Sequence, residues 1–286
     1  MKKRFRLKKG FIITGSIIAF GILCFIYAHF EYNNIKIKRI TLESPKITGD
    51  GIRVMFITDF QFDTKSKINR EALRNVVAKA NSQNADLLFL GGDYVNYRRN
   101  RPVFYEIFQD LRIPPLGAFA VLGNHDYYSY NENITQFDSM GIKLLLNESA
   151  RIPLGEDEYI QVAGVDEPWF GSPDFEKAME GTGPEHFLFF LCHNPDYFVD
   201  DISREQRSLL DFTLSGHTHA GQVTFFGLFG KPPLSFKNSF KYRYGLKKLK
   251  GVPIYVSSGV GGSALGYYIR FFARPEIVII DLKGSK

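Results

Sequence analysis

Side chains that commonly bind metal ions recur between residues 59 and 219 of this 286-residue chain. Each of them follows a short apolar run with the composition of a buried β-strand. The candidates, in chain order, are Asp59, Gln61, Asp93, Asn124, His125, His193, His217 and His219. The set offers oxygen and nitrogen donors and no thiolate, which suits Mn, Fe, Zn or Mg better than a structural zinc site.

A βαβ rhythm that begins near residue 50 positions these side chains. Strands are expected at 52–58, 86–90, 118–122, 187–191 and 212–214, and helices at 68–80 and near 103–111. In layered α/β folds, the carboxyl ends of the strands line the ligand crevice. One such polar cluster is an ordinary strand-ending turn. Five clusters that all carry metal-ligand side chains are expected to converge on one site.

The ordered clusters resemble the signature of the calcineurin-like metallophosphoesterases. They read Asp59-Phe60-Gln61, Gly92-Asp93, Gly123-Asn124-His125-Asp126, His193-Asn194-Pro195-Asp196 and Gly216-His217-Thr218-His219. The last motif continues into 220–222, Ala-Gly-Gln, which is similar to the extension found in the membrane-associated bacterial branch. Each motif alone is weak evidence, and the specificity lies in their order. The resemblance covers about residues 50–282 and implies an α/β fold, a four-layer α/β/β/α sandwich of two mixed β-sheets flanked by helices.

The resemblance also implies a dinuclear metal centre. A first metal site would consist of Asp59, residue 61, Asp93 and His219, and a second of Asp93, Asn124, His193 and His217. The carboxylate of Asp93 would bridge two divalent ions, Mn by preference, with Zn, Fe or Mg as alternatives. A water shared by the ions would be deprotonated near neutral pH and would attack phosphorus. His125 would assist the leaving oxygen, with Asp126 fixing its tautomer; the alternative is a loop histidine that Asp126 merely satisfies.

Gln61 departs from the family pattern, which has histidine at this position. A neutral carbonyl oxygen is a weaker ligand than imidazole for Zn or Fe. Gln61 would therefore bias the first metal site toward Mn or Mg, which is our expectation, or leave it weakly occupied. A third alternative is that Asp63, on the same side of an extended chain, supplies a carboxylate instead.

The N-terminus predicts a membrane anchor. Residues 2–9 contain six Lys and Arg and no acid, so they account for the whole net charge of +6 and leave a neutral body. A neutral body argues against a nucleic-acid-binding face. Residues 11–30 contain no charged side chain and would span about 30 Å as a helix, the thickness of a bilayer core. A cleavable signal peptide fits the same pattern, but no Ala-x-Ala-like site follows, so we expect a retained anchor.

We divide the chain into a basic N-terminus with a transmembrane helix (1–30), a juxtamembrane connector or edge strand (31–50) and a catalytic domain (51–286). The positive-inside bias favours a cytoplasmic N-terminus and an extracytoplasmic domain, although Lys36, Lys38 and Arg39 follow the apolar run. Cys24 and Cys192 allow no internal disulfide framework. The sequence does not predict the oligomeric state.

A segment without Asp or Glu lies between Asp211 and Glu276 and bears on the substrate. Its basic residues are Lys231, Lys237, Lys241, Arg243, Lys247, Lys248, Lys250, Arg270 and Arg274. They alternate with aromatic residues, a mixture that fits a nucleic-acid strand or an anionic membrane surface. The anchor favours the membrane. The alternative is that the aromatic residues pack on a sheet and the lysines are solvated.

Three functions remain open at this point. The first is hydrolysis of a phosphate or pyrophosphate ester on a membrane-linked substrate, such as a phospholipid, a nucleotide-linked lipid or a cell-envelope intermediate. The second is a tethered nucleotidase or general phosphodiesterase. The third is a non-catalytic scaffold with a weakened first metal site, which Gln61 favours and His125 opposes. The partners expected are a lipid bilayer and a phosphate-ester substrate, with no specific nucleic acid.

Overall fold

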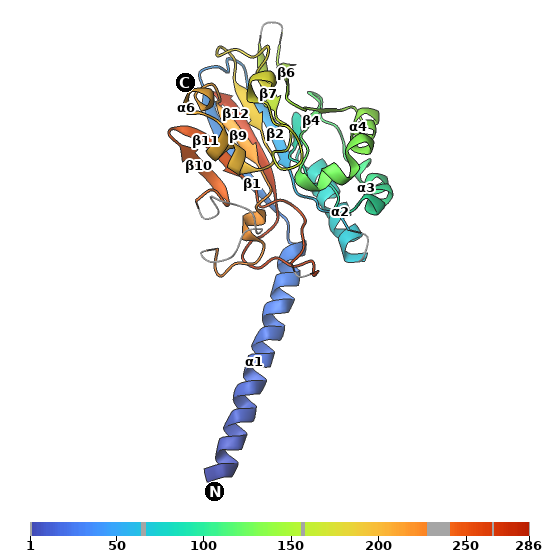
Figure 1. The fold of residues 1–286 in the computed structure, drawn as a ribbon, viewed down its shortest axis with the longest axis vertical. Helices are drawn as coiled ribbons and strands as arrows, with labels where there is room; N and C mark the ends of the chain where they lie inside the picture. Colours follow the sequence, from blue (N-terminus) through green and yellow to red (C-terminus); the bar gives the residue numbers. More distant parts are fainter. Residues whose placement is uncertain (1, 64–66, 156–157, 228–240, 265, 286) are drawn as a thin grey trace.

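The computed structural model describes residues 2–63, 67–155, 158–227, 241–264 and 266–285. Helix α1 (Lys2–Asn33) extends from one edge of the domain as a stalk (Figure 1). Its segment Phe11–Asn33 is long and apolar enough to cross a membrane, judged by length and composition. The predicted N-terminal apolar helix is therefore present.

Two six-stranded mixed sheets form the centre of the domain. The first sheet has the order β1 (Lys36–Ser44), β12 (Glu276–Gly284), β2 (Ile52–Ile57), β3 (Leu87–Leu90), β4 (Ala118–Ala120) and β5 (Ile142–Leu144). The second has the order β10 (Gly245–Leu249), β11 (Val252–Val256), β9 (Phe212–Ser215), β8 (Leu188–Leu191), β7 (Tyr159–Gly164) and β6 (Glu148–Pro153). The pairs β12–β2, β6–β7 and β10–β11 are antiparallel, and the other neighbours are parallel.

Alternating residues along the strands divide the core into layers. Phe56 and Phe89 of the first sheet and Phe189 of the second are buried in the cluster between the sheets. Their sequence neighbours point outward, because side chains alternate between the two faces of a strand. The outer face of the first sheet packs under α2 (Lys67–Asn81), α3 (Arg101–Phe108) and α4 (Tyr130–Ser139), which lie together in Figure 1.

The outer face of the second sheet packs against shorter elements. These are α5 (Phe175–Ala178), a π-turn at Tyr197–Asp201 and α6 (Arg204–Arg207). The four-layer α/β/β/α prediction is confirmed. Residues 36–44, predicted as a connector or an edge strand, form edge strand β1. Strands β5–β7 and β10–β12 and helix α4 were not assigned from the sequence.

The strand directions place the strand ends that carry the motifs at the edge where α1 attaches. Strand β1 begins just after α1 and runs away from it, and β12 is parallel to β1. Strand β2 is antiparallel to β12, so β2 and its parallel neighbours β3 and β4 run back toward α1. The backbone amide of His217, after β9, donates to Asp59, after β2, so the second sheet ends at the same edge.

Buried Glu276 links the two sheets at the start of β12. Its carboxylate accepts hydrogen bonds from the Tyr255 hydroxyl of β11 at 2.9 Å and the Ser258 amide at 3.1 Å, and it lies 3.1 Å from Lys36 Nζ of β1. We expect Glu276→Ala to lower the free energy of unfolding by about 2–3 kcal/mol, because these buried donors lose their acceptor. Chemical denaturation in detergent micelles measures the change. Glu43→Ala, at an exposed position of β1, is the control, and equal effects would contradict the role of Glu276.

Candidate metal centre

Left-handed backbone turns follow the strands that carry the motifs. The φ angles of Asp59, Gln61, Asp93, His217 and His219 are 56°, 40°, 58°, 67° and 50°. Such angles cost about 1–2 kcal/mol in a residue with a side chain and persist where surrounding contacts enforce them. Strain of this kind concentrates at functional sites.

Two overlapping groups of side chains lie at these turns. Ligand atoms of Asp59, Asp93 and His219 lie within 4.8 Å of one another, and so do those of Asp93, His193 and His217. Asp93 belongs to both groups. Residues that are far apart in the sequence are therefore brought together in the combination that the resemblance implies. Their role as metal ligands remains a prediction.

Hydrogen bonds direct the imidazole rings of the second group. Nδ1 of His193 donates to the carbonyl oxygen of Gly91 at 2.6 Å, and its Nε2 lies 3.5 Å from Asp93 Oδ2. Nδ1 of His217 lies 3.0 Å from Oδ1 of Asn124, which brings Asn124 to the same place. Within the described part of the chain, the buried Nε2 atoms of both histidines have no hydrogen-bond partner. Unpaired buried nitrogens next to a carboxylate fit a bound divalent cation.

The protonation of the site also fits a cation. Burial lowers the pKa of His217 to about 3, and burial together with the Arg270 charge holds the pKa of His219 well below its usual range. Both rings are therefore neutral, as a metal ligand must be. Burial opposes ionisation of Asp93, but the neighbouring His193 outweighs it and lowers the pKa of this carboxyl.

Gln61 lies against the shared carboxylate. Its Nε2 donates to Asp93 Oδ2 at 2.9 Å, and exchanging the amide oxygen and nitrogen would bring a ligand oxygen to the same place. The alternative residue, Asp63, is in neither group; its carboxylate accepts from Asn100 at 3.4 Å. The geometry therefore favours Gln61 over Asp63 at the first metal site.

The predicted contact between Asp126 and the His125 ring is wrong. The Asp126 carboxylate accepts hydrogen bonds from the backbone amides of Asp93, Tyr94 and Gly123 at 2.7, 2.9 and 2.8 Å. The His125 ring is partly exposed, and its Nδ1 has no partner among the described residues. The physical reason is the 3₁₀ turn at Asn124–Ser129, which directs Asp126 inward to the strand ends. Asp126 thus fixes the backbone of the shared ligand.

The motif glycines make room for the carboxylates. A Cβ atom on Gly123 would lie 2.3 Å from Asp93 Oδ1, and one on Gly216 would lie 2.3 Å from Asp59 Oδ2. Both distances are far below van der Waals contact. Glycine is therefore required in both motifs because the backbone comes close to a carboxylate, within the first sheet at Gly123 and between the two sheets at Gly216.

Comparisons with known proteins agree with this geometry. Residues 52–221 match the calcineurin-like phosphoesterase family. The chain belongs to this family. The predicted family is confirmed, and the protein is a hydrolase of ester bonds whose family depends on two metal ions.

Relatives of this phosphoesterase share most of its length. It is 28% identical over 276 residues to an uncharacterized metallophosphoesterase of Aquifex aeolicus, covering 93% of this chain and 98% of that protein. It is 28% identical over 267 residues to phosphodiesterase YaeI of Escherichia coli, covering 90% and 92%. It is 30% identical over 249 residues to a Danio rerio transmembrane protein with metallophosphoesterase domain, covering 82% and 54%.

The loop after β7 adds two residues that sequence reasoning missed. Glu167 is buried, its Oε1 has no partner among the described residues, and its pKa is raised by burial, with His193 lowering it and Asp93 raising it. The Trp169 ring lies 4.5 Å from the His217 ring and is 39% exposed. The sequence could have indicated this loop, because Asp166 and Glu167 form another polar cluster after an apolar run.

The acid-free segment divides into different environments. Arg243 and Arg270 are buried, which contradicts a solvated or lipid-facing role for these two residues. Phe225, Phe226 and Tyr267 are exposed. Lys231 and Lys237 lie outside the described residues.

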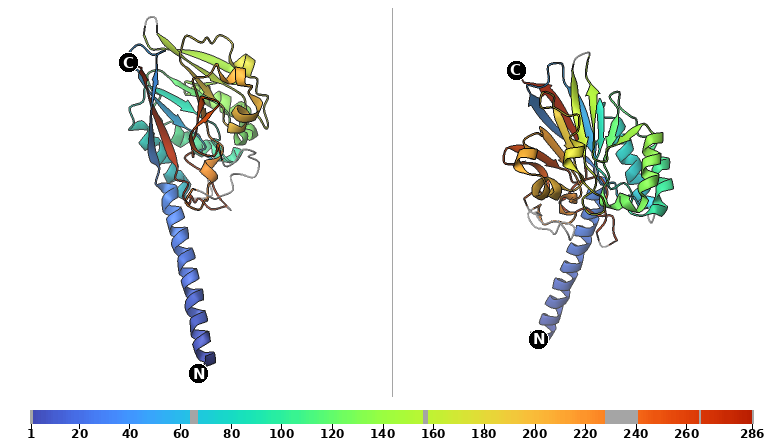
Figure 2. Two further views of the ribbon diagram at one scale, coloured as in Figure 1. Left: turned by 90° about the vertical axis from the view of Figure 1, so that its left-hand side faces the viewer. Right: turned by 45° about the horizontal axis from the view of Figure 1, so that its top comes forward.

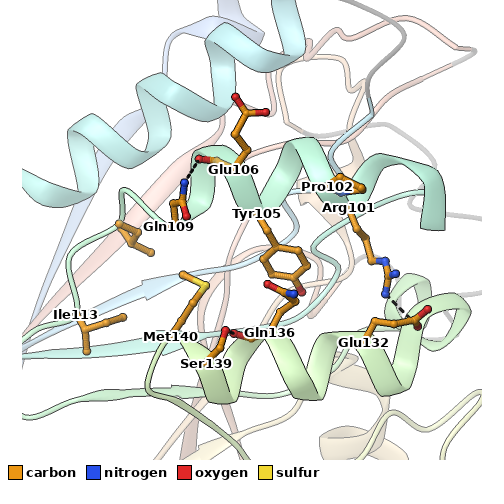
Figure 3. Close-up of a pocket in the computed structure, with 11 residues that line it drawn as sticks. Arg101, Pro102, Tyr105, Glu106, Gln109, Ile113, Glu132, Gln136, Ser139 and Met140 are labelled. Carbon is orange, nitrogen blue, oxygen red and sulfur yellow. Dashed lines mark hydrogen bonds and ion pairs between the residues drawn. The ribbon is translucent and has the colours of Figure 1, made fainter.

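A groove between α3 and α4 is separate from the metal centre (Figure 3). Arg101 and Glu132 form an ion pair at its mouth, and Tyr105 and Met140 line it. None of the candidate metal ligands lines this groove.

We expect Gln61→His to raise the affinity of the first metal site for Zn and Fe, because imidazole binds these ions better than an amide oxygen. Elemental analysis of purified wild type and variant measures metal content and preference. Gln109→His, at the exposed C-cap of α3, is the matched control. Unchanged stoichiometry and preference in Gln61→His would show that residue 61 is not a ligand.

Proposed function

We propose that this phosphoesterase hydrolyses a phosphate or pyrophosphate ester on a membrane-linked substrate. Candidate substrates are a phospholipid, a nucleotide-linked lipid or a cell-envelope intermediate. One observation carries the proposal: the strand ends that form the metal centre and the stalk helix α1 share one edge of the domain (Figure 1). A substrate held in the bilayer that α1 crosses would meet this edge first.

Exposed aromatic side chains at the same edge support the proposal. The Tyr267 ring packs edge-on against Phe25 of α1, with ring centroids 5.7 Å apart. Phe25 belongs to the apolar segment, so Tyr267 lies at the depth of the proposed membrane helix. Aromatic rings concentrate at the membrane–water interface, where one end is apolar and the other is wet. The metal centre would then lie near the level of the lipid headgroups.

We assign the residues as follows. Asp59, Gln61, Asp93 and His219 would hold one divalent ion, and Asp93, Asn124, His193 and His217 the other, with Mn preferred. Such a pair of ions lowers the pKa of water and offsets charge on phosphate oxygens. The backbone amide of His125 donates to Asp93 Oδ1 at 2.9 Å, which holds this histidine beside the shared carboxylate. The partly exposed ring of His125 would donate a proton to the leaving oxygen.

A tethered nucleotidase is the second candidate. Trp169 favours it, because its partly exposed ring beside His217 offers a face on which a nucleobase could stack.

We also propose a retained single-pass anchor (1–30) with a cytoplasmic N-terminus, a connecting segment (31–50) and an extracytoplasmic catalytic domain (51–286).

Presentation of the substrate distinguishes the two candidates. We expect a phospholipid phosphoester in detergent–lipid mixed micelles to be hydrolysed faster than a water-soluble nucleotide at the same bulk concentration. The assay compares Mn, Mg and Zn and measures released phosphate or alcohol. Asp93→Asn is the inactive control, because it weakens both metal sites. Preference for the soluble nucleotide, independent of micelles, would support the nucleotidase.

The proton-donor role of His125 is tested by the leaving group. We expect His125→Asn to lower kcat by about 10²–10⁴-fold for an alkyl leaving group, the usual contribution of general acid catalysis. The loss should be much smaller for 4-nitrophenol, which leaves without protonation. Metal content should equal that of the wild type. An equal loss for both leaving groups, or loss of metal, would contradict the role.

A further inference from the structure

Arg270 is a buried cation next to the first metal site. Its side chain is 0% exposed, and in the described structure its hydrogen bonds go to neutral groups. Nε donates to the carbonyl oxygen of Gly261 at 3.1 Å, and Nη1 donates to the carbonyl oxygens of His219 and Ala273 at 2.8 and 3.2 Å. Burial of a charge is costly unless the surrounding groups compensate for it. These contacts show what the guanidinium organises.

The Arg270 guanidinium contacts His219 directly and Asp59 through Gly261, and both are proposed ligands of the first metal site. Its Nη2 lies 3.1 Å from Nδ1 of His219, so the guanidinium holds both the ring and the main chain of this histidine. The opposite ring nitrogen, Nε2, lies 3.6 Å from Asp59 Oδ1. Gly261, the other partner of Arg270, donates its amide to the carbonyl oxygen of Asp59 at 2.8 Å. One side chain therefore connects His219 with the backbone of Asp59.

The backbone of His219 needs such support. His219 and Ala220 both lie in the left-handed region, with φ angles of 50° and 53°. Two consecutive residues in this region are unfavourable without compensating contacts. The hydrogen bond from Arg270 to the His219 carbonyl oxygen supplies one of them.

The outer side of the same segment rests on the last turns of α1. The Arg270 amide donates to the Ala28 carbonyl oxygen at 3.0 Å, and the Phe272 amide donates to Glu31 Oε2 at 2.7 Å. Tyr32 of α1 is 1% exposed, and its ring lies 6.0 Å from that of Tyr268. The end of α1 is thus packed into the domain, whereas most of the helix extends away from it (Figure 2).

Gln222, in the extension after the last motif, also contacts the segment that carries Arg270. Nε2 of Gln222 donates to the Ile269 carbonyl oxygen at 2.8 Å, and the Phe271 amide donates to the Gln222 carbonyl oxygen at 3.1 Å. Gln222 therefore fixes the 269–271 backbone on either side of Arg270.

From these contacts we propose that Arg270 is a positioning residue of the first metal site and that the last turns of α1 hold it in place. The membrane helix is then a structural part of the metal centre as well as an anchor. Loss of the contacts between the last turns of α1 and residues 270–272 would therefore change the position of His219. The proposal rests on the metal-site assignment and does not depend on the identity of the substrate.

The test uses the full-length chain in detergent micelles, loaded with Mn. We expect Arg270→Gln to weaken one of the two bound ions by about 10–100-fold, the usual effect of removing a group that is hydrogen-bonded to a ligand. Elemental analysis after dialysis measures the stoichiometry. The EPR spectrum reports the change independently, because the signal of a coupled Mn pair gives way to that of a single ion.

The matched control is Arg207→Gln. Arg207 is also buried and donates to backbone carbonyl oxygens, those of Phe198 and Val199 among them, but it lies on the outer side of the second sheet. We expect this variant to be less stable but to retain both ions. Equal metal loss in the two variants would reduce the effect of Arg270 to general destabilisation and overturn the proposal.

A second variant tests the connection to α1 and covers the case in which Arg270→Gln does not fold. Glu31→Ala removes the acceptor of the Phe272 amide without touching the metal centre, and it should weaken the same ion. Combining Glu31→Ala with Arg270→Gln should give less than the sum of the single effects. Full retention of both ions in Glu31→Ala would show that α1 does not position the site.

Discussion

Two buried carboxylates, Asp59 and Asp93, share one small space where the two sheets meet, and the surrounding structure is arranged around them. Burial raises the pKa of Asp59 to about 6, with His193 lowering it and the charge of Asp93 raising it. Like charges so close together require compensation from imidazoles, backbone amides or cations. The left-handed turns, the motif glycines and the inward-facing Asp126 all follow from bringing these two groups together.

The compensation is unequal on the two sides of Asp93. The second metal site has the imidazoles of His193 and His217 and the Asn124 oxygen, and a 2.6 Å hydrogen bond to the Gly91 carbonyl oxygen directs the His193 ring. The first has an amide at residue 61 and a histidine held by a buried cation. The amide oxygen of residue 61 is a weaker ligand than imidazole for Zn or Fe, whereas Arg270 fixes the ring of His219. The two sites are therefore expected to differ in strength and metal preference.

The position of the stalk helix gives this asymmetry a context. The end of α1 is packed against the segment that carries Arg270, which connects the proposed first metal site with the apolar helix. The proposed second metal site lies beside Trp169, in the loop that follows β7.

Local sequence predicted the strands that end in a motif, the order of the motifs and the candidate ligand types, because apolar runs and strand-ending turns are short-range features. Strand β2 and helix α2 lie within one residue of their predicted bounds, and the family follows from motif order. By contrast, β12 pairs with β1 and β2 across more than two hundred residues, and no local pattern in either strand specifies that pairing.

The sequence by itself therefore determined the family of the protein, and it predicted which residues would bind metal. Only the tertiary structure decided what holds them. Asp126 serves three backbone amides rather than the His125 ring, because the direction of a side chain after a turn depends on the turn geometry. Arg270, which in sequence is one basic residue in an acid-free aromatic stretch, is a buried support of His219. Burial and long-range contacts depend on how the two sheets and α1 pack against one another, and no single segment of the sequence specifies that packing.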